Sequence, residues 1–481
     1  MFTTNIIFIH FLVWVAIHCC DSAWSNGSVV FVILDQEVTP HMETATHLAS
    51  HLTHQANQLQ LNHKIYIASE EWPNVAAWTY IPVLERVSSS HGDNSTWVVL
   101  LGERVQVKLT ALLDVLQAHN SSQLIFLGRG VSDHQETIIH HYQSVDPDNP
   151  FLYPDARFGI VLSTPLVNRL AKMWNDSGGR KQQSEFNIDA AYEFSTLVWS
   201  VGVRLTHTSA FCITDRPGCA LVYTKLTRCS NKLQTEDIHF AVKSCSHFHE
   251  ERLPIIQDTW LGDATNHAIY SDVKDSRYGT VSLGVPNTER GHCGKTLAII
   301  RHAAQLSHIQ WLAIVDDDTL ISVQRLTRLL SCYDPGEYVA LGERYGFQAT
   351  TSHGYDYLTG GAGMVFSKVL VNRLAFPSVC KCPSDDTPDD MFLGICLQRM
   401  GLPVIHSPTF HQARPKDYPE ALLEGEAPIS FHKYWMMNPR EAYNLYLHTT
   451  PYSPQPGSDD QPVSDSSMAA NAQKIHNIDE L

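Results

Sequence analysis

Residues 311–322 read WLAIVDDDTLIS, an apolar run that ends abruptly in three acids. We expect residues 311–315 to form a buried strand with Asp316, Asp317 and Asp318 at its carboxyl end. In a parallel sheet, that end of the strands faces a ligand crevice. Carboxylate oxygens there suit hard divalent cations such as Mn²⁺ or Mg²⁺, which bridge to phosphate oxygens. The alternative is a solvated acidic turn, and the downstream segments argue against it.

Other strand-like runs alternate with helix-like ones along the chain. The alternation indicates an α/β fold with a mostly parallel, Rossmann-related sheet. We expect strands at residues 29–34, 98–101, 124–127 and 268–270, and helices at 297–306 and 323–330.

Two segments of the first half recur in the second half in the same order. FGIVLSTPLVNRLA (158–171) aligns with AGMVFSKVLVNRLA (362–375), and GVRLTHTSAFC (202–212) aligns with GLPVIHSPTFH (401–411). Two ordered matches favour a duplicated domain with a boundary near residues 230–240.

The copies differ where chemistry is expected. Aligning SSQLIFLGRGV with HIQWLAIVDDD places Arg129, Gly130 and Val131 opposite the acidic triplet, and Cys212 opposite His411. On this alignment the first copy lacks a metal site, so we expect it to be degenerate and non-catalytic.

A glycine cluster follows the triplet in HGYDYLTGGAGMVFS, residues 353–367. Gly360 and Gly361 precede an apolar, helix-like run and allow close backbone approach to a bound sugar or acceptor. The cluster is not a phosphate loop, because no Gly-Lys-Ser/Thr follows it.

A second acidic motif opens the predicted helix in SDDTPDDMFLGICLQRMG, residues 384–401. Pro388 suits a first helical turn, and a helix N-terminus favours ionised Asp389 and Asp390. Helix capping accounts for Asp389. Asp390 remains available as the general base that inverting sugar transfer requires.

One histidine is expected to complete the metal shell. His411 in HSPTFHQARP is the first candidate, and His432 in PISFHKYW competes with it. Zinc at Cys380 and Cys382 is a poorer interpretation, because a single intervening residue is not the usual ligand spacing.

Composition and the chain ends indicate the compartment. The net charge of −16 argues against nucleic acid and anionic membranes as partners. Residues 6–17 are apolar and suit a signal peptide ending near residue 23, although an uncleaved anchor is the alternative. Residues 478–481 read IDEL, which differs from the endoplasmic-reticulum retrieval signal only at its first position. Asn26, Asn94, Asn120 and Asn175 begin glycosylation sequons.

The cysteines agree with a lumenal protein. Most should pair in an oxidising lumen, and an odd number leaves one thiol over. Beyond the leader the chain has Cys212, Cys219, Cys229, Cys245, Cys293, Cys332, Cys380, Cys382 and Cys396. Residues 451–481 are rich in Pro, Ser and Asp and read as a flexible tail.

In order, WLAIVDDDTLIS, YLTGGAGMVFS, PDDMFLG and HSPTFHQARP resemble segments of the Fringe-like β1,3-glycosyltransferases. NTERGHCGKTLAI, LGERYG and PISFHKYW are most similar to the branch that adds glucose to O-linked fucose on thrombospondin type 1 repeats. The resemblance covers about residues 241–450 strongly and the first half more loosely.

The resemblance implies two tandem nucleotide-sugar-transferase-like domains and a set of site residues. Asp318 and His411 would bind Mn²⁺ or Mg²⁺, and Asp390 would be the catalytic base. Nucleotide-sugar contacts would come from Asp316, Asp317, Asp272, Lys295, Gly360 and Gly361.

The expected organisation is a signal peptide at 1–23, a degenerate domain at 24–235, a catalytic domain at 236–450 and a tail at 451–481. The expected partners are UDP-glucose, O-fucosylated thrombospondin repeats and the retrieval receptor of the endoplasmic reticulum, where a soluble lumenal protein would reside. Transfer of GlcNAc or galactose is the first alternative. A non-enzymatic lectin or folding factor is less favoured, because the second copy keeps its acidic triplet.

Overall fold

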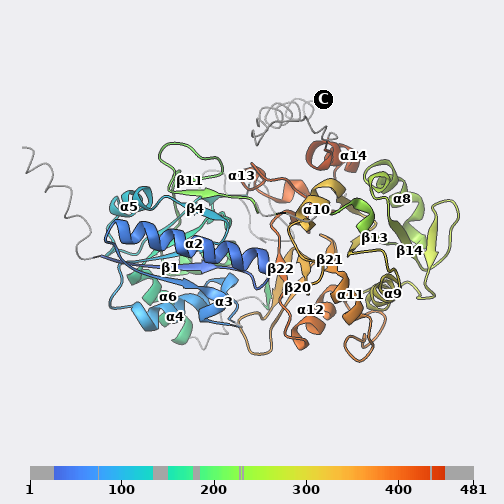
Figure 1. Ribbon diagram of the computed structural model, residues 1–481, viewed down its shortest axis with the longest axis horizontal. Coiled ribbons are helices and arrows are strands. Elements are labelled where there is room, and N and C mark those ends of the chain that lie inside the picture. The colour runs from blue at the N-terminus through green and yellow to red at the C-terminus, as the bar shows by residue number, and fades with distance from the viewer. Residues whose placement is uncertain are drawn as a thin grey trace, which may run out of the picture.

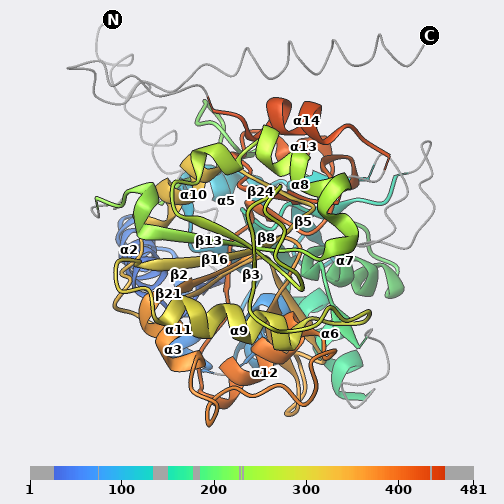
Figure 2. The same cartoon turned by 90° about the vertical axis from the view of Figure 1, so that its right-hand side faces the viewer.

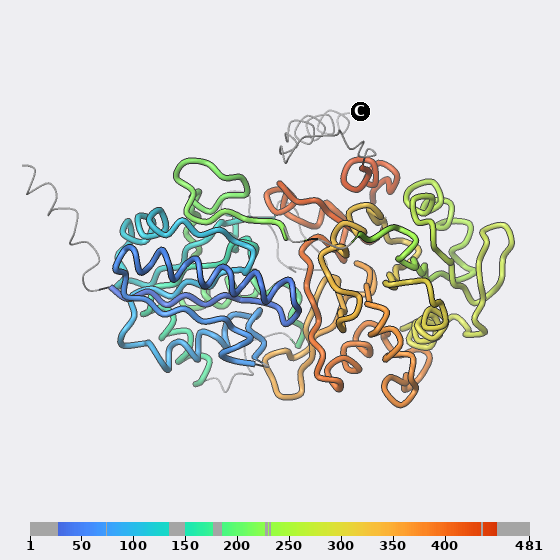
Figure 3. Tube along the Cα trace, in the orientation of Figure 1, coloured from blue at the N-terminus to red at the C-terminus, as the bar shows by residue number. Residues whose placement is uncertain are grey.

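The computed structural model describes residues 27–73, 75–133, 150–176, 185–226, 229, 232–433 and 436–449. Two α/β units lie side by side along the long axis of the molecule, the first blue to green and the second yellow-green to red (Figure 1). The same division is visible in the chain trace (Figure 3). The predicted leader, Asn26 and the tail lie outside the described residues. Within those residues, no helix has the length and apolarity needed to cross a membrane.

The first unit contains a six-stranded sheet. Its strands, in spatial order, are β2 (Asn62–Ile67), β1 (Ser28–Leu34), β3 (Trp97–Gly102), β8 (Gly159–Ser163), β5 (Phe126–Gly128) and β10 (Thr206–His207). Alternate side chains of β1 point to opposite faces. Val29 and Phe31 pack with α2 (Thr39–Gln58) and α5 (Leu109–Gln117), whereas Val30 and Val32 pack with α4 (Ile81–His91) and α6 (Thr164–Asp176). Helices therefore cover both faces (Figure 1).

The second unit contains a seven-stranded sheet. Its strands, in order, are β15 (Thr280–Ser282), β14 (His267–Ser271), β13 (Ile238–Lys243), β16 (Trp311–Asp316), β21 (Met364–Ser367), β18 (Ala340–Gly342) and β22 (Ile405–His406). One face packs against α8 (His249–Asp258) and α10 (Val323–Leu330). The other packs against α9 (Cys293–Ala304), α11 (Lys368–Leu374) and α12 (Asp389–Arg399). Figure 2 shows these two helical layers above and below the sheet.

The predicted α/β architecture is confirmed, with mostly parallel sheets. One strand in each large sheet, β8 or β21, runs antiparallel to its neighbours. The prediction that the apolar run after Gly363 is helical is wrong. Residues 364–367 form strand β21, and the helix begins only at Lys368. A short, fully buried run carries no helical period that distinguishes the two states.

The two sheets share one strand order. The order β2-β1-β3-β8-β5-β10 repeats as β14-β13-β16-β21-β18-β22, with matching parallel and antiparallel pairs. A small sheet recurs as well. β4 (Val105–Val107), β12 (Leu221–Tyr223) and β11 (Phe211–Cys212) correspond to β17 (Thr319–Ile321), β24 (Ser430–His432) and β23 (Phe410–His411).

This correspondence corrects one alignment made from the sequence. β16 follows the position of β3, because Trp97 pairs with Val29 in β1 as Trp311 pairs with Ile238 in β13. Gly102, Glu103 and Arg104 therefore stand where the acidic triplet stands, not residues 129–131, which follow β5. Both LIFL (124–127) and LAIV (312–315) are apolar runs that enter a sheet strand, so their composition does not tell them apart.

The units touch through paired backbone and side chains. Strand β9 (Phe186–Asn187) of the first unit pairs with β19 (Arg344–Phe347) of the second, which also pairs with β20 (Tyr355–Leu358). Gln36 Nε2 donates to the His406 carbonyl at 3.0 Å. Trp78 Nε1 donates to Asp356 Oδ2 at 3.1 Å. The Gln36 contact joins the segment that follows β1 to the second unit.

Candidate active site

The acidic triplet lies where β16 turns into β17. Asp316 is the last residue of β16, and its parallel neighbour in β13 is Lys243. The turn is fixed by Thr319, whose hydroxyl accepts from the Asp316 amide at 3.2 Å and donates to the Gly361 carbonyl at 2.8 Å. This contact brings the glycine cluster to the end of β16.

Asp316, Asp318 and His432 form a compact group that could hold a metal ion, because one ligand atom of each lies within 4.8 Å of the others. We call these three residues the cation-binding group. His432 Nε2 is 3.1 Å from Asp318 Oδ1. The other ring nitrogen, Nδ1, lies 3.0 Å from the Gln412 carbonyl. A proton on Nδ1 would leave Nε2 free to ligate, which is the usual outer-shell arrangement of a metal-binding histidine. Carboxylate and imidazole donors fit Mn²⁺ well.

The electrostatics of His432 follow from these carboxylates. Burial disfavours its charged form, but the hydrogen bond to Asp318 and the charges of Asp318 and Asp316 outweigh burial and raise its pKa. Burial likewise opposes ionisation of Asp318, yet the contacts with His432 and Arg252 hold the pKa of that carboxyl below its usual value.

His411 does not reach Asp318. Its ring stacks on Phe431 with centroids 4.6 Å apart, and its Nε2 lies 3.5 Å from Glu426 Oε1. His411 pairs with Phe431 across parallel strands β23 and β24, whereas His432, next along β24, pairs with Thr319. The competing candidate His432, and not His411, has a ring nitrogen that lies with the carboxylates of Asp316 and Asp318.

Asp317 is buried behind the cation-binding group. Its carboxylate accepts from Ser244 Oγ at 2.7 Å and from Arg252 Nη1 at 2.8 Å. Burial raises its pKa to about 6 despite those donors. Arg252 Nη1 also lies 3.1 Å from Asp318 Oδ2. Asp317 thus anchors Arg252 beside the triplet.

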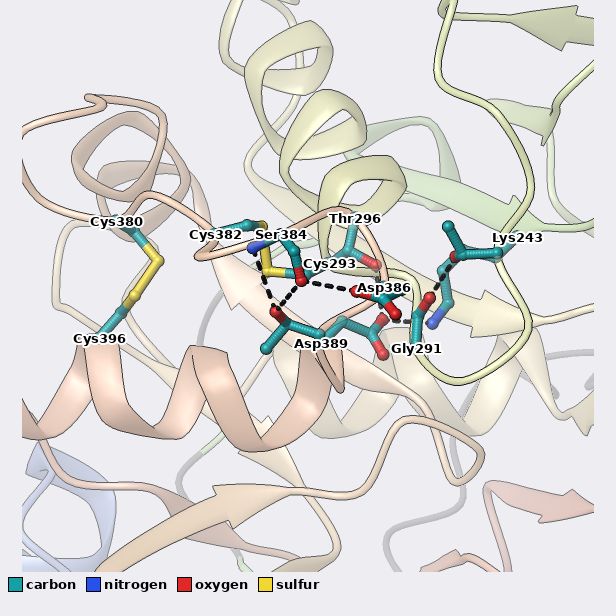
Figure 4. Close-up of a disulfide and its surroundings, with 12 residues drawn as sticks. Lys243, Gly291, Cys293, Thr296, Cys380, Cys382, Ser384, Asp386, Asp389 and Cys396 are labelled. Carbon is teal, nitrogen blue, oxygen red and sulfur yellow. Dashed lines mark hydrogen bonds and ion pairs between the residues drawn. A yellow bond between two sulfur atoms is a disulfide. The ribbon is translucent and has the colours of Figure 1, made fainter.

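Lys243 links the triplet to the second acidic motif. Its Nζ is 3.1 Å from Asp316 Oδ1 and 2.6 Å from Asp389 Oδ2. Thr296 Oγ1 also donates to Asp389 Oδ2, at 2.6 Å. Burial alone would raise the pKa of Asp389, but the Lys243 charge and these hydrogen bonds lower it. Asp389 is therefore held ionised (Figure 4).

Asp390 lies beside this ion pair at the start of α12. Its carboxylate accepts from the Met391 amide at 2.7 Å and from the Gly360 amide at 3.3 Å. Burial, reinforced by the negative charge of Asp389, raises the pKa of Asp390 to about 6. A carboxyl group poised near neutrality has the basicity that general-base catalysis uses.

The glycine cluster connects Asp390 with the cation-binding group. A Cβ at Gly361 would overlap the His432 imidazole, whereas a Cβ at Gly360 would lie 3.8 Å from Asp390. Asp390 and His432 therefore flank consecutive residues of one turn. The structure brings the two acidic motifs to a single site.

Asp272 and Lys295 flank the same edge of the sheet. Asp272 accepts from the Ser246 amide at 2.7 Å, and hydrogen bonds from Ser246 and Ser271 lower its pKa against the opposing effect of burial. Lys295 Nζ donates to the Ser244 carbonyl at 2.7 Å. Both residues thus contact the segment that follows β13.

Disulfides hold the loop that leads into α12. Cys293–Cys382 ties this loop to the start of α9, and Cys380–Cys396 ties it to α12 itself (Figure 4). The other pairs are Cys212–Cys219 and Cys229–Cys332. Cys245 remains a buried free thiol. The expectation that one cysteine stays unpaired is confirmed.

Sequence reasoning missed Lys243 and Arg252. A lysine that ends the apolar strand IHFAVK was a usable signal, because an unpaired buried ammonium is costly and implies carboxylate partners. Arg252 carried no such signal. Its place depends on α8 packing beside the triplet, where the guanidinium also lies 3.8 Å from the Phe248 ring centroid.

Known proteins resemble this chain over most of its length. Residues 233–452 match the family described as Fringe-like. The β-1,3-glucosyltransferase of Mus musculus is 42% identical over 426 residues, covering 87% of this chain and 86% of the relative. The β-1,3-glucosyltransferase of Homo sapiens is 42% identical, covering 87% and 84%. A β-1,3-N-acetylglucosaminyltransferase, manic fringe of Danio rerio, is 28% identical over 210 residues, covering 38% and 58%.

Proposed function

The chain belongs to the Fringe-like glycosyltransferase family, and from that premise we propose that it is an inverting β1,3-glucosyltransferase. Its donor is UDP-glucose, and its acceptor is O-linked fucose on thrombospondin type 1 repeats. The observation that carries the proposal is the convergence of Asp318 and His432 with Asp390 around the Gly360–Gly361 turn.

Asp318, His432 and Asp316 hold Mn²⁺ or Mg²⁺ in this proposal. A bound divalent cation supplies positive charge that offsets the charge developing on the departing diphosphate. Arg252 restrains the triplet from the opposite side through Asp317 and Asp318. The chain's own contribution is to fix the carboxylates in the geometry that receives the donor.

Asp390 acts as the general base. Its carboxylate removes the proton from the fucose 3-hydroxyl, whose oxygen then attacks the anomeric carbon of glucose from the face opposite UDP. Positioned proton transfer of this kind contributes about 10²–10⁴-fold to rate. Asp389 is the weaker base of the two, because the contacts with Lys243 and Thr296 lower its pKa.

The donor lies along the carboxyl ends of β13, β14 and β16. Asp316 and Asp317 border the pocket, with Asp272 and Lys295 toward the nucleotide and Gly360 and Gly361 toward the sugar. In support, Ser244 joins two of these residues, because its hydroxyl binds Asp317 and its carbonyl binds Lys295.

A donor comparison tests the reaction. The full chain with Mn²⁺ is given an O-fucosylated thrombospondin repeat and UDP-glucose, UDP-GlcNAc or UDP-galactose, and the product mass is measured. Glucose transfer is expected to dominate. Dominant transfer of GlcNAc, the sugar in the name of the manic fringe relative, or of galactose would replace the donor assignment. Transfer of none would favour a non-enzymatic lectin or folding factor.

The first unit, residues 24–235, is proposed to be a degenerate copy of the catalytic unit, residues 236–450. Shared strand order supports the duplication. Register places Arg104 opposite Asp318 and Tyr223 opposite His432. Ala190 and Ala191 open α7 (Ala190–Ser200), as Asp389 and Asp390 open α12. The first unit therefore lacks the metal-binding carboxylates and the general base of the proposed mechanism.

Lumenal residence in the endoplasmic reticulum is also proposed, with retrieval through a receptor for residues 478–481. Four disulfides are consistent with an oxidising compartment. The described sequon residues Asn94, Asn120 and Asn175 are exposed. Glycan analysis of secreted and retained material, with and without the last four residues, measures both features.

A further inference from the structure

A cavity of about 260 Å³ lies at the carboxyl ends of β1 and β3, where the first unit meets the second. Its wall on the first unit includes Arg104, Arg157 and Tyr223, and its wall on the second unit includes Arg344 and Phe410. The volume is somewhat below the roughly 300–1,000 Å³ of drug-sized ligand sites. One monosaccharide with a small substituent fits this scale.

The cavity occupies the position of the active site in the first unit. Arg104 and Tyr223 correspond by strand register to Asp318 and His432. Ala190 and Ala191, at the start of α7, line it as well. A cationic guanidinium thus stands where the second unit places a metal-binding carboxylate. A ligand at this position of the first unit meets a guanidinium group instead of a carboxylate.

The cavity lining includes carboxylates, each with a protein partner: Asp35, Glu103, Asp155, Asp189, Glu343 and Asp417. Asp155 binds Arg157 through two hydrogen bonds, 2.9 and 2.7 Å long. Glu103 lies 2.8 Å from His41 Nδ1. Glu343 accepts from the Gln412 amide, and burial raises its pKa to about 8, so it is mostly neutral at pH 7. Their pairing with protein donors reduces their repulsion of an anion without removing it, so the anion has to bind at the guanidinium donors that the protein leaves unused.

The guanidinium groups retain unused donors. Arg157 has a side chain only 5% exposed, and among the described residues its Nη1 has no hydrogen-bond partner. The ion pair of Arg104 with Glu103 spans 3.8 Å, longer than a hydrogen bond. Arg344 contributes a buried Nε that also has no partner in the described part of the chain. An orphaned, charged donor is costly unless a ligand or water satisfies it.

Aromatic rings complete the wall. Arg104 and Arg157 lie 5.4 and 5.7 Å from the centroid of the Tyr223 ring, and Arg344 lies 4.4 Å from that of Trp78. Flat apolar rings beside hydrogen-bond donors suit a sugar, which has C–H faces and polar edges.

We propose that this cavity is a second, metal-independent ligand site that binds a monosaccharide bearing a phosphate or carboxylate group. The anion contacts Arg157 and Arg104, and the sugar ring lies among the aromatic side chains. Because Arg344 and Phe410 belong to the second unit, an occupied site also strengthens the contact between the units. The proposal does not rest on the transferase reaction.

Calorimetric titration of the full chain in a metal chelator tests the proposal. Glucose 1-phosphate, glucuronate, glucose and inorganic phosphate are compared, so that the sugar and each kind of anion are measured separately. We expect at least one anionic sugar to bind one-to-one, about tenfold or more tighter than glucose or phosphate. Failure of both anionic sugars to bind, or equal binding of inorganic phosphate, would overturn the proposal.

Variants locate the site. Arg104→Gln should weaken the anionic sugar about tenfold or more, and Asp318→Ala in the other unit should leave its affinity unchanged. Undiminished binding by Arg104→Gln, or loss of binding in Asp318→Ala, would contradict the assignment. Thermal melting verifies folding. If Arg104→Gln is unstable, Ala190→Leu fills the cavity wall without removing charge and should weaken binding in the same way.

Discussion

Lys243 Nζ lies 2.6 Å from Asp389 Oδ2, and both groups are buried. This contact lowers the pKa of Asp389, and the negative charge of its carboxylate helps to raise the pKa of Asp390. The two consecutive acids of one motif therefore have different roles. In the proposed mechanism Asp390 exchanges a proton, while Asp389 stays ionised beside it.

Replacing Lys243 by methionine should damage stability and transfer together. Asp316 and Asp389 would lose their shared counter-ion, and breaking a buried pair of this kind typically costs about 3–5 kcal/mol. Because the Lys243 charge lowers the pKa of Asp390, its loss should raise that pKa and shift the acidic limb of the pH–rate profile to higher pH. Urea unfolding and rates across pH measure both effects. Lys172→Met, at an exposed position of α6, is the matched control. An unaltered pH profile in folded Lys243→Met protein would refute the coupling.

Substitutions of His432 and His411 should have different effects on metal binding. His432→Ala removes a proposed ligand. Loss of a residue that only hydrogen-bonds a metal ligand typically lowers affinity about 10–100-fold, so Mn²⁺ affinity should fall by at least that much. His411→Ala removes a ring stacked on Phe431 and should lower stability without changing Mn²⁺ affinity. Calorimetric titration with Mn²⁺ and UDP measures the affinity. The reverse pattern would restore His411 as the ligand.

Alanine substitutions at Gly360 and Gly361 test whether the turn formed by these residues positions His432. In Gly361→Ala the new Cβ would overlap the His432 imidazole, so Mn²⁺ binding and turnover should both fall. Gly360→Ala places its Cβ 3.8 Å from Asp390, an ordinary contact, and should retain Mn²⁺ affinity. Equal Mn²⁺ affinities in the two variants would show that Gly361 does not position His432.

Much of the candidate site was predictable because its carboxylates stand directly before or after apolar runs. WLAIV and PDDMFLG each carry a strong local pattern, and strand β16 and helix α12 appear where those patterns lie. The choice between His411 and His432 was different. Each histidine ends a short strand, and only the pairing of β24 with β17 shows which one reaches Asp318.

Contacts between distant segments were not predicted either, because they depend on how the chain folds and not on a local sequence pattern. Lys243 and Asp389 are 146 residues apart, and no local period links them. The misplaced alignment of residues 129–131 shows the limit of composition, because similar buried strands recur throughout an α/β fold. The pairing of Trp97 with Val29 resolves the alignment.

The pH dependence of transfer should follow Asp390. Its pKa is raised to about 6, and only the ionised form accepts the acceptor proton, so the rate at saturating Mn²⁺ should rise through pH 6 and level off above it. A carboxyl pKa above its unfolded value makes the ionised group destabilising at neutral pH. Asp390→Asn should therefore melt at a higher temperature than the parent at pH 7. A lower melting temperature would contradict this environment for Asp390.

The central claim is that Asp390 accepts the proton of the attacking hydroxyl at a site where Asp318 holds the donor's cation. Single-turnover transfer of glucose to an O-fucosylated repeat by Asp390→Asn tests it most directly, with UDP-glucose binding measured alongside and exposed Asp176→Asn as control. The account predicts donor binding near that of the parent and a rate lower by about 10²–10⁴-fold. A folded Asp390→Asn protein that transfers glucose at the parental rate would contradict it.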